Sequence, residues 1–301
     1  MGGFERFLAG AACGIGLDVI AALLPAPGRK GRAALAIALA AVPIPVPFFI
    51  DASPPWPAVL SVLLGLAFMR VCEIARAPAR FQRKERIVRA GTIFETRLMR
   101  RVPRRVPVRE WLLCAALIAA GVGALIAAFH LGLPVPPYAL AGWPRWIAAA
   151  AGGYLLFEGA MHTLVSLLLL IGWEHAPVQR APIRSRSLAE FWGFRWNRVV
   201  SLWLQKNLFE PLARRGSPRL GILLAFAVSA LLHFYMVLPA AGLIPALWMA
   251  AFFLAHGALS ALERPLGVKE WPPAAGRAFV IACFLVTLPL FAEPAMRALG
   301  G

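Results

Sequence analysis

A polar, tryptophan-rich segment at residues 187–197 and a histidine downstream of it carry the residue types best suited to chemistry. The segment reads Ser-Leu-Ala-Glu-Phe-Trp-Gly-Phe-Arg-Trp-Asn, and it precedes an apolar stretch that contains His233. An ionisable side chain at membrane depth is costly to bury, so it suggests a function, here chemistry on a lipid. A neutral imidazole suits a general base for an alcohol. The alternative is a histidine that only bonds to a neighbouring helix.

Two polar residues could assist that histidine. Asn197 closes the tryptophan-rich segment, and its carboxamide could donate to a developing oxyanion or orient a substrate. Otherwise it is a helix-surface amide that faces water. Ser229 lies four residues before His233, on the same face of a helix, so a serine–histidine nucleophile pair is geometrically possible. More often such a serine bonds the carbonyl group one turn earlier.

Other polar side chains also fall inside apolar stretches. Glu158 and His162 are spaced i, i+4 and can bond each other, either as a structural pair or as a proton relay. His256, with Ser260 one turn further on, is a similar but weaker case. Asp18 in the first apolar stretch has no explanation from the sequence.

The composition indicates whether water or lipid surrounds the elements that position these residues. Of the 301 residues, 60% are hydrophobic and only 15% are charged, which is more apolar surface than a soluble domain can bury. We therefore expect an all-α integral membrane protein, a single helical bundle over residues 1–301 with about eight spans. Three prolines between residues 43 and 47 should kink or unwind the second span. The expected spans are roughly 7–24, 33–50, 57–75, 111–129, 146–171, 220–238, 243–261 and 277–292.

The net charge of +17 is distributed in a way that argues for a membrane and against nucleic acid. Four segments between the expected spans hold 28 of the 31 Lys and Arg residues. With eight spans all four lie on one side, which we take as the cytoplasm. The compact loops favour a bacterial inner membrane over an organelle. The four segments are 25–32, 70–110, 172–219 and 262–277.

Two of these cytoplasmic segments are too long to be simple turns. Residues 76–110 predict a basic amphipathic helix in the interface, which either anchors the surface or binds an anionic cosubstrate. Within 176–213, Ser187 and Glu190 fit a capping box that starts a helix. Apolar side chains then recur at helical spacing, and Pro211 and Gly216 end the pattern. We expect an interfacial or re-entrant helix whose stripe consists of Trp192, Trp196, Val199, Val200, Trp203 and Leu208.

Several chemistries lack their sequence signatures. The four cysteines are scattered without CxxC spacing, and the five histidines form no cluster. No P-loop, GxSxG, HExxH or aspartate-rich motif is present. We therefore predict no metal site and no bound cofactor.

The segment 187–197 resembles a motif of the wax-synthase branch of the membrane-bound O-acyltransferases. A Ser-Gly-x-x-His-like run follows downstream in that family, and here it reads Ser-Ala-Leu-Leu-His over residues 229–233. The similarity is specific across about 187–235. The sequence has Ala230 in place of glycine, and it departs from the family at Phe234, where a polar or acidic residue is common, and in being shorter than many relatives. The matching motif residues are Ser187, Leu188, Glu190, Phe191, Trp192, Gly193, Arg195, Trp196 and Asn197.

The resemblance implies transfer of a fatty acyl group from acyl-CoA to a hydroxyl acceptor, such as a long-chain alcohol that gives a wax ester. His233 would take the hydroxyl proton, and Asn197 would position a reactant or stabilise the oxyanion. Acyl-CoA enters as a cosubstrate and the acceptor comes from the membrane lipids. The implied substrate- or acyl-CoA-binding residues are Trp192, Arg195, Trp196, Arg198 and Ser229.

This assignment makes one geometric demand, and two other functions remain as alternatives. His233 lies thirteen residues from Leu220, about 20 Å along a helix, whereas Asn197 is in a nominal loop. They meet only if residues 187–213 enter the membrane or a cavity reaches His233. A proton-coupled transporter using Glu158, His162 and His233 is the rival, although no internal repeat is present. A non-catalytic membrane scaffold is the third option.

Overall fold

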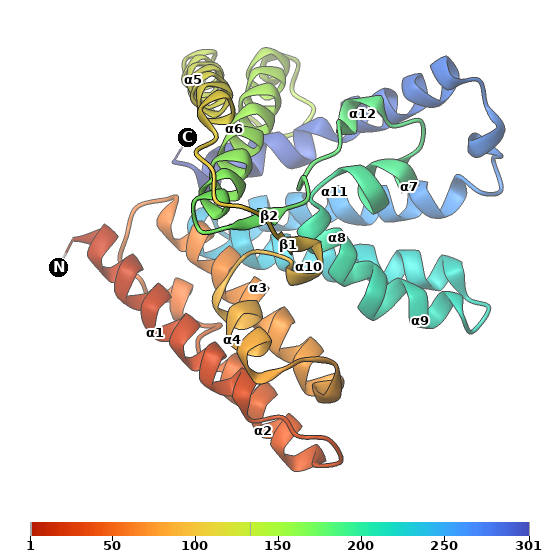
Figure 1. Cartoon of the computed structure of the whole chain (residues 1–301). Coiled ribbons are helices and arrows are strands. Elements are labelled where there is room, and N and C mark those ends of the chain that lie inside the picture. The colour runs from red at the N-terminus through yellow and green to blue at the C-terminus, as the bar shows by residue number, and fades with distance from the viewer. Residues whose placement is uncertain (1, 133, 301) are drawn as a thin grey trace. The chain divides into compact units, whose positions relative to one another are not determined.

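The computed structural model describes residues 2–132 and 134–300 and is mainly helical, with almost no sheet among these residues (Figure 1). Among these residues, eight helical stretches are long and apolar enough to cross a membrane, so the expected multi-pass integral membrane fold is confirmed. The second stretch, Lys30–Phe48, is interrupted near its three prolines, as predicted: α2 stops at Ala41 and the 3₁₀ turn η1 starts at Val46. The long helices are α1 (Gly3–Leu23), α2 (Lys30–Ala41), α3 (Trp56–Arg76), α5 (Val108–His130), α6 (Trp143–Leu170), α10 (Pro218–Ala241), α11 (Leu243–Leu262) and α12 (Pro273–Ala298).

Short elements connect these helices. The only strands in the described ranges are β1 (Met99–Arg101) and β2 (Trp173–His175), which pair antiparallel with Arg100 opposite Glu174. They join the two long basic segments to each other. The remaining short elements are η1 (Val46–Phe48), η2 (Pro78–Arg80), α4 (Arg83–Gly91), η3 (Thr96–Leu98), η4 (Leu140–Gly142), η5 (Pro182–Arg184), α7 (Leu188–Glu190), η6 (Phe191–Arg195), α8 (Arg198–Leu204), η7 (Gln205–Phe209), α9 (Glu210–Ala213) and η8 (Val268–Glu270).

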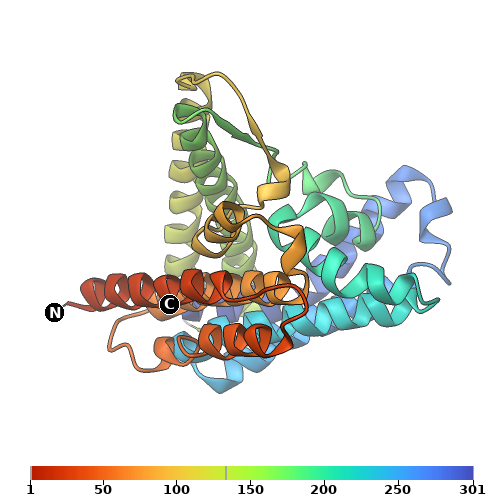
Figure 2. The ribbon, with the colours of Figure 1, turned by 60° about the horizontal axis from the view of Figure 1, so that its bottom comes forward.

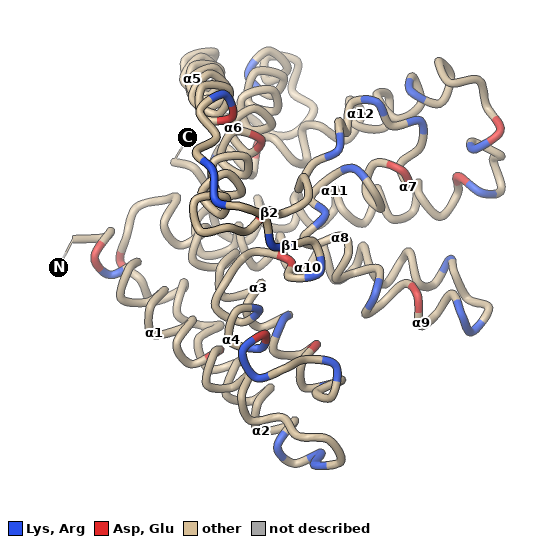
Figure 3. Tube along the Cα trace, in the orientation of Figure 1, with Lys and Arg blue, Asp and Glu red and all other residues tan. Residues whose placement is uncertain are grey.

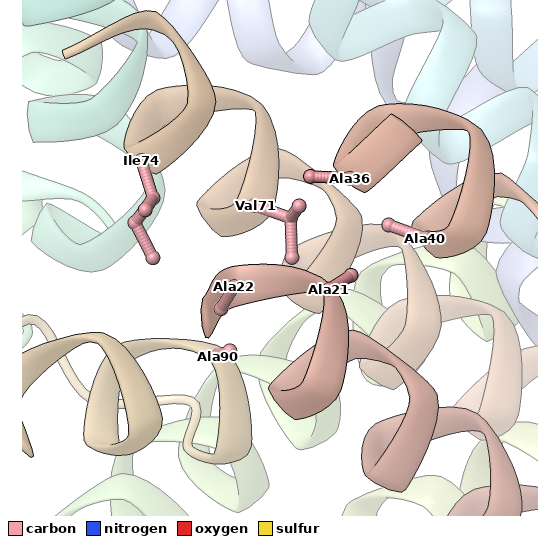
Figure 4. Packing of buried hydrophobic residues seen from close by; sticks show 7 residues of the cluster. All are labelled: Ala21, Ala22, Ala36, Ala40, Val71, Ile74 and Ala90. Atoms are coloured by element: carbon pink, nitrogen blue, oxygen red, sulfur yellow. The ribbon is translucent and has the colours of Figure 1, made fainter. Parts of the chain in front are cut away.

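The chain forms two compact units. The first contains the residues up to Arg97 together with Leu232–Ala246 and Arg297–Gly300. Its core packs α1, α2, α3 and α4 mostly through alanine side chains (Figure 4), which let the helix backbones approach closely. A Cβ atom on Gly14 of α1 would lie 2.4 Å from Leu64 Cδ2 of α3, so a larger residue there would require the Leu64 side chain to shift. The core residues are Ala21, Ala22, Ala36, Ala40, Val71, Ile74 and Ala90.

A buried group of charges ties α3 to α4 within the first unit. Arg89 and Glu95 are fully buried, and their side chains pair at 2.9 Å. Glu73 accepts from Arg89 at 2.7 Å, while Arg70 and Arg97 also contact Glu95. The segment 76–110 therefore contains a helix, α4, but part of its positive charge is paired inside the protein.

The second unit comprises Leu98–Leu231 and Leu247–Met296. In it α5 and α6 lie side by side along most of their length (Figures 1 and 2). Glycines bring these two helices into backbone contact: a Cβ on Gly121 would lie 2.6 Å from the Leu156 nitrogen, and one on Gly159 would lie 2.8 Å from Ile118 Cγ1. The Trp146 indole also donates to Glu293 of α12 at 2.8 Å. These contacts fix α6, which carries part of the site described below.

Charge and apolar surface are divided between connections and spans. Lys and Arg gather at helix ends and in the connecting segments, while the long helices are nearly free of charge along their length (Figure 3). Many large apolar side chains on those helices are exposed, for example Leu112, Leu231 and Val286, at 65–68% of their surface. Such exposure is the expected surface of a protein that faces lipid.

Candidate functional site

The motif 187–197 begins as predicted and then departs from a regular helix. Ser187 Oγ accepts from the Glu190 backbone N–H at 2.9 Å, which is half of the predicted capping box. The Glu190 carboxylate does not return to Ser187, because it accepts from the Arg186 N–H at 2.7 Å and from Arg195 Nε at 2.7 Å. Burial alone would raise the pKa of Glu190, but these donors outweigh burial and lower it. The motif is thus anchored at its start.

The expectation of one continuous helix through the motif is wrong. A short α7 passes into the π-helical turn η6, and the chain then breaks at Trp196 before α8 starts at Arg198. The break is located at Asn197, whose φ of +37° and ψ of +65° lie in the left-handed region. Asparagine is one of the few side chains that tolerates this conformation. The break reorients the side chains on either side of it.

Asn197 is held at its break from two sides. Its Oδ1 accepts from the Val200 N–H at 3.4 Å and so caps α8, while its own backbone N–H donates to Gln179 Oε1 at 3.2 Å. The carboxamide NH₂ group makes no hydrogen bond to another described residue and is half-buried. The amide therefore has one end committed to the backbone and one donor end available.

The motif contacts the middle of the spans in its unit. Trp196 stacks on Tyr154 and Phe157 of α6 with ring centroids 6.0 and 5.5 Å apart. These positions lie thirteen to sixteen residues before Leu170, the end of α6, which is roughly 20–24 Å along a helix. Phe191 also stacks on Trp196, at 5.7 Å. Trp196 is therefore packed between aromatic rings and does not lie at the ends of the spans.

Trp192 extends the same arrangement to α11 and α12. Its indole Nε1 donates to His256 Nδ1 at 3.1 Å, and His256 Nε2 lies 2.9 Å from Thr287 Oγ1. The pairing of His256 with Ser260 considered from the sequence does not form, since Ser260 Oγ has no hydrogen-bond partner among the described residues. Sequence spacing could not reveal the partner of His256, because it lies 64 residues away.

Glu263 is a site residue that the sequence analysis missed. Its carboxylate accepts from the backbone N–H groups of Leu188 and Ala189, the latter at 2.9 Å, at the start of the motif. Burial raises the pKa of Glu263, and the two N–H donors partly oppose that rise. The available signal was a lone acid directly after an apolar span, which is weak by itself.

The arginines of the motif differ in what they bind. Arg195 forms an ion pair with Glu190 and donates to the Arg180 carbonyl oxygen at 2.8 Å, so its charge is already compensated. Arg198 donates to the Pro177 carbonyl oxygen at 3.2 Å. Burial lowers the pKa of Arg198, and the neighbouring cation of Arg180 lowers it further. Like charges on Arg198 and Arg180 that repel each other, with no carboxylate paired to either among the described ion pairs, favour binding of an anion.

Glu158 and His162 form the contact that their i, i+4 spacing predicted. His162 Nε2 and Glu158 Oε1 are 3.1 Å apart on α6. The other carboxylate oxygen of Glu158 is buried and has no hydrogen-bond partner among the described residues. Tyr154, one turn earlier on the same face, stacks on Trp196, so the pair lies next to the motif. Whether the pair has a role stays a prediction.

His233 and Ser229 both lie in α10, four residues apart. His233 is half-buried and Ser229 is buried. His233 belongs to the first unit, whereas Asn197 belongs to the second. The meeting of His233 with Asn197, and the cavity that it requires, stay predictions. In the first unit Asp18 is fully buried, and neither of its carboxylate oxygens has a hydrogen-bond partner among the described residues.

The fold and the motif define a multi-pass membrane protein with a polar, tryptophan-rich segment among its apolar helices. Residues 173–255 match the model of the Membrane bound O-acyl transferase family. That range contains both Asn197 and His233. The predicted resemblance to the membrane-bound O-acyltransferases is therefore confirmed.

Individual relatives narrow the resemblance to one branch. The chain is 31% identical over 182 residues, 56% of its own length and 50% of the relative, to "Probable long-chain-alcohol O-fatty-acyltransferase 1" of Arabidopsis thaliana. It is 33% identical over 136 residues to "Probable long-chain-alcohol O-fatty-acyltransferase 2" of the same plant, covering 41% of this chain and 37% of the relative. "Long-chain-alcohol O-fatty-acyltransferase" of Simmondsia chinensis is 33% identical over 134 residues, which cover 40% of this chain and 38% of the relative. The chain thus spans half or less of the length of these relatives, and nothing in the matches favours a transporter.

Proposed function

We propose that the protein is an integral-membrane O-acyltransferase that moves a fatty acyl group from acyl-CoA to the hydroxyl group of a lipid acceptor. The acceptor is a long-chain alcohol and the product a wax ester. The observation that carries this proposal is the family match over 173–255, which covers a motif packed beside the middle of the spans. The names of the relatives support the alcohol as acceptor.

The reaction needs one base and one oxyanion donor. His233 takes the proton of the acceptor hydroxyl as its oxygen attacks the thioester carbonyl carbon. The available NH₂ donor of Asn197 stabilises the negative charge that develops on the carbonyl oxygen. The carbon–sulfur bond then breaks, the proton passes to the leaving sulfur, and CoA departs as a thiol. This assignment requires Asn197 and His233 to face one cavity within the membrane.

The acyl donor carries phosphates, and the arginines supply their binding site. We propose that Arg198 together with Arg180 holds a CoA phosphate, because their like charges lack a carboxylate partner among the described ion pairs. Arg195 instead holds the motif through Glu190 and the Arg180 carbonyl. The aromatic rings of Trp192 and Trp196 offer apolar surface for an acyl chain, with Ser229 on the neighbouring helix.

The decisive experiment measures acyl transfer from labelled acyl-CoA to a long-chain alcohol in membranes that contain the full chain. His233→Ala should abolish transfer, whereas His130→Ala, an exposed histidine at the end of α5, should leave it unchanged. Asn197→Ala should lower kcat by about 10²–10³-fold, the usual loss for an oxyanion donor. Full activity of the His233 variant would refute the base assignment, and an inactive wild-type protein would refute the proposed reaction.

We further place the protein in a bacterial cytoplasmic membrane. This placement depends on the compact loops alone, because the relatives named above are plant proteins and do not support it. Fractionation of a bacterial source by density gradient, followed by immunodetection, tests it.

A further inference from the structure

His256 is completely buried on α11 and is bonded at both ring nitrogens. The indole N–H of Trp192 can only donate, so Nδ1 of His256 must accept and cannot carry a proton. A neutral imidazole then has its proton on Nε2, which donates to Thr287 Oγ1. The Thr287 hydroxyl in turn donates a hydrogen bond to the Cys283 carbonyl oxygen at 2.8 Å. Every donor in this chain has an acceptor, and the tautomer of His256 is fixed.

The surroundings of His256 keep water away from this chain of hydrogen bonds. The rings of Phe252 and Phe284 lie with their centroids 4.4 and 4.7 Å from the imidazole. Phe252 is itself buried. A histidine without access to water, and with both nitrogens engaged, is poorly suited to exchange a proton with a substrate. It is well suited to hold Trp192 in one orientation.

A second contact, from the residue directly after the same helix, holds the start of the motif. Glu263 lies seven residues after His256, directly after Leu262, the last residue of α11. Its carboxylate accepts from the N–H groups of Leu188 and Ala189. The motif is thus attached through its backbone to Glu263, at the end of α11, and, four residues further on, through the Trp192 side chain to His256 within α11.

A short path leads from Trp192 to Asn197. Phe191 packs edge-on against Trp192 at 4.9 Å and stacks nearly parallel on Trp196 at 5.7 Å. The Trp196 N–H also donates to the Phe191 carbonyl oxygen at 2.8 Å, closing the π-helical turn directly before Asn197. A displaced Trp192 would therefore shift the turn that sets the direction of the Asn197 side chain.

We propose that His256 is a positioning residue for acyl transfer: it fixes the indole of Trp192 and so orients the turn that carries Asn197, without exchanging a proton itself. This inference rests on the proposed function. Thr287 completes the arrangement by holding the imidazole in the tautomer that accepts from the indole. Glu263 anchors the other end of the motif.

The kinetic test compares two substitutions of the same residue. His256→Gln keeps one acceptor and one donor, whereas His256→Leu removes both. Loss of one to two hydrogen bonds predicts that His256→Leu lowers kcat about tenfold, with the KM of the alcohol changed by less than about twofold. His256→Gln should keep kcat within about threefold of wild type. Ser260→Ala, a matched change on the same helix, should have no effect.

A readout that does not depend on catalysis completes the test. The protein contains ten tryptophans, and Trp192→Phe identifies the Trp192 signal in a spectrum of ¹⁵N-indole-labelled protein in micelles. This signal should move in His256→Leu and stay close to its wild-type position in His256→Gln.

The outcomes separate the inference from the proposed function. Unchanged kcat in His256→Leu, or an unmoved Trp192 signal, would overturn the positioning role. So would a His256→Gln variant as impaired as His256→Leu while its Trp192 signal is native, because the imidazole would then act chemically. Wild-type protein without acyl transfer would refute the proposed function instead, with the indole signal still reporting on the contact between Trp192 and His256.

Discussion

Replacing Glu95 by glutamine tests the buried ion pairs of the first unit most directly. Glu95 is fully buried between three guanidinium groups, with nitrogen–oxygen distances of 2.5 Å to Arg70, 2.9 Å to Arg89 and 2.9 Å to Arg97. Glu95→Gln keeps the shape of the side chain and removes only its charge. Glu73 then remains as the carboxylate within 4 Å of all three arginines.

The expected cost follows from burial. Removing one partner of a buried ion pair typically costs about 3–5 kcal/mol, because the other charge stays buried without compensation. Arg89 is completely buried and cannot turn toward water, so we expect about 4 kcal/mol of lost unfolding free energy. Asp51→Asn, which breaks the exposed pair with Arg6, is the matched control in the same unit. Exposed pairs contribute about 0–1 kcal/mol.

The same group predicts how stability changes in acid. Burial alone would raise the pKa of Glu95, but the hydrogen bond from Arg97 and the charges of Arg70 and Arg89 outweigh it, so the pKa falls below its ordinary value of 4.5. A lowered folded-state pKa gives stability that is present above about pH 4.5 and is lost as the pH falls toward the folded-state value. Glu95→Gln removes this contribution, so the variant should lose less stability than wild type over that range.

Unfolding of the purified protein in detergent, followed by circular dichroism during SDS titration at pH 7 and at steps below pH 5, measures both effects. The reasoning would be refuted if Glu95→Gln cost no more than Asp51→Asn at pH 7. It would equally be refuted if the variant and the wild type lost stability in parallel on acidification.

Two further predictions concern single contacts, and a third concerns metal dependence. Gly121→Ala should cost about 1–3 kcal/mol of unfolding free energy, because the added Cβ would lie 2.6 Å from the Leu156 nitrogen. Gly123→Ala is the control and should be neutral, since nothing lies within 4 Å of its added Cβ. SDS titration compares the stability of the two variants, and equal stability would contradict the packing of α5 on α6. Trp146→Phe should cost about 1.5–3 kcal/mol by removing the indole donor to Glu293, and an unchanged unfolding midpoint would contradict that contribution. EDTA should leave acyl transfer unchanged, since the proposed base is an imidazole and the sequence carries no metal-binding motif; inhibition reversed by an added divalent cation would contradict it.

The spans could be predicted from the sequence because their signal is local. A run of about 20 apolar residues needs a bilayer whatever surrounds it, and each of the eight expected ranges overlaps a helix of the structure. The kink of the second span was equally local, since proline cannot donate in a helix ladder. The Glu158–His162 contact followed from helix geometry alone.

The details of the site could not be predicted, because they depend on contacts between distant segments. Helical spacing of Trp192, Trp196 and Trp203 favoured a single helix, yet tertiary contacts on either side of Asn197 override that local preference. His256 lies 64 positions after Trp192, and Glu263 lies 75 positions after Leu188, the residues that they bind. Likewise, the long segment 76–110 looked like a surface helix because composition does not reveal that Arg89 is paired with buried carboxylates.

The two π-helical turns explain why the motif carries a glycine between its aromatic residues. Gln205, at the start of η7, donates from Nε2 to the Gly193 carbonyl oxygen within η6 at 2.8 Å. A Cβ atom at residue 193 would lie 3.2 Å from that same nitrogen, which is too close without a shift of the glutamine. Wide turns of this kind are rare and often occur at functional sites. The glycine thus lets one turn bind the other, so that the rings before it and the asparagine after it are held by the same short stretch of backbone.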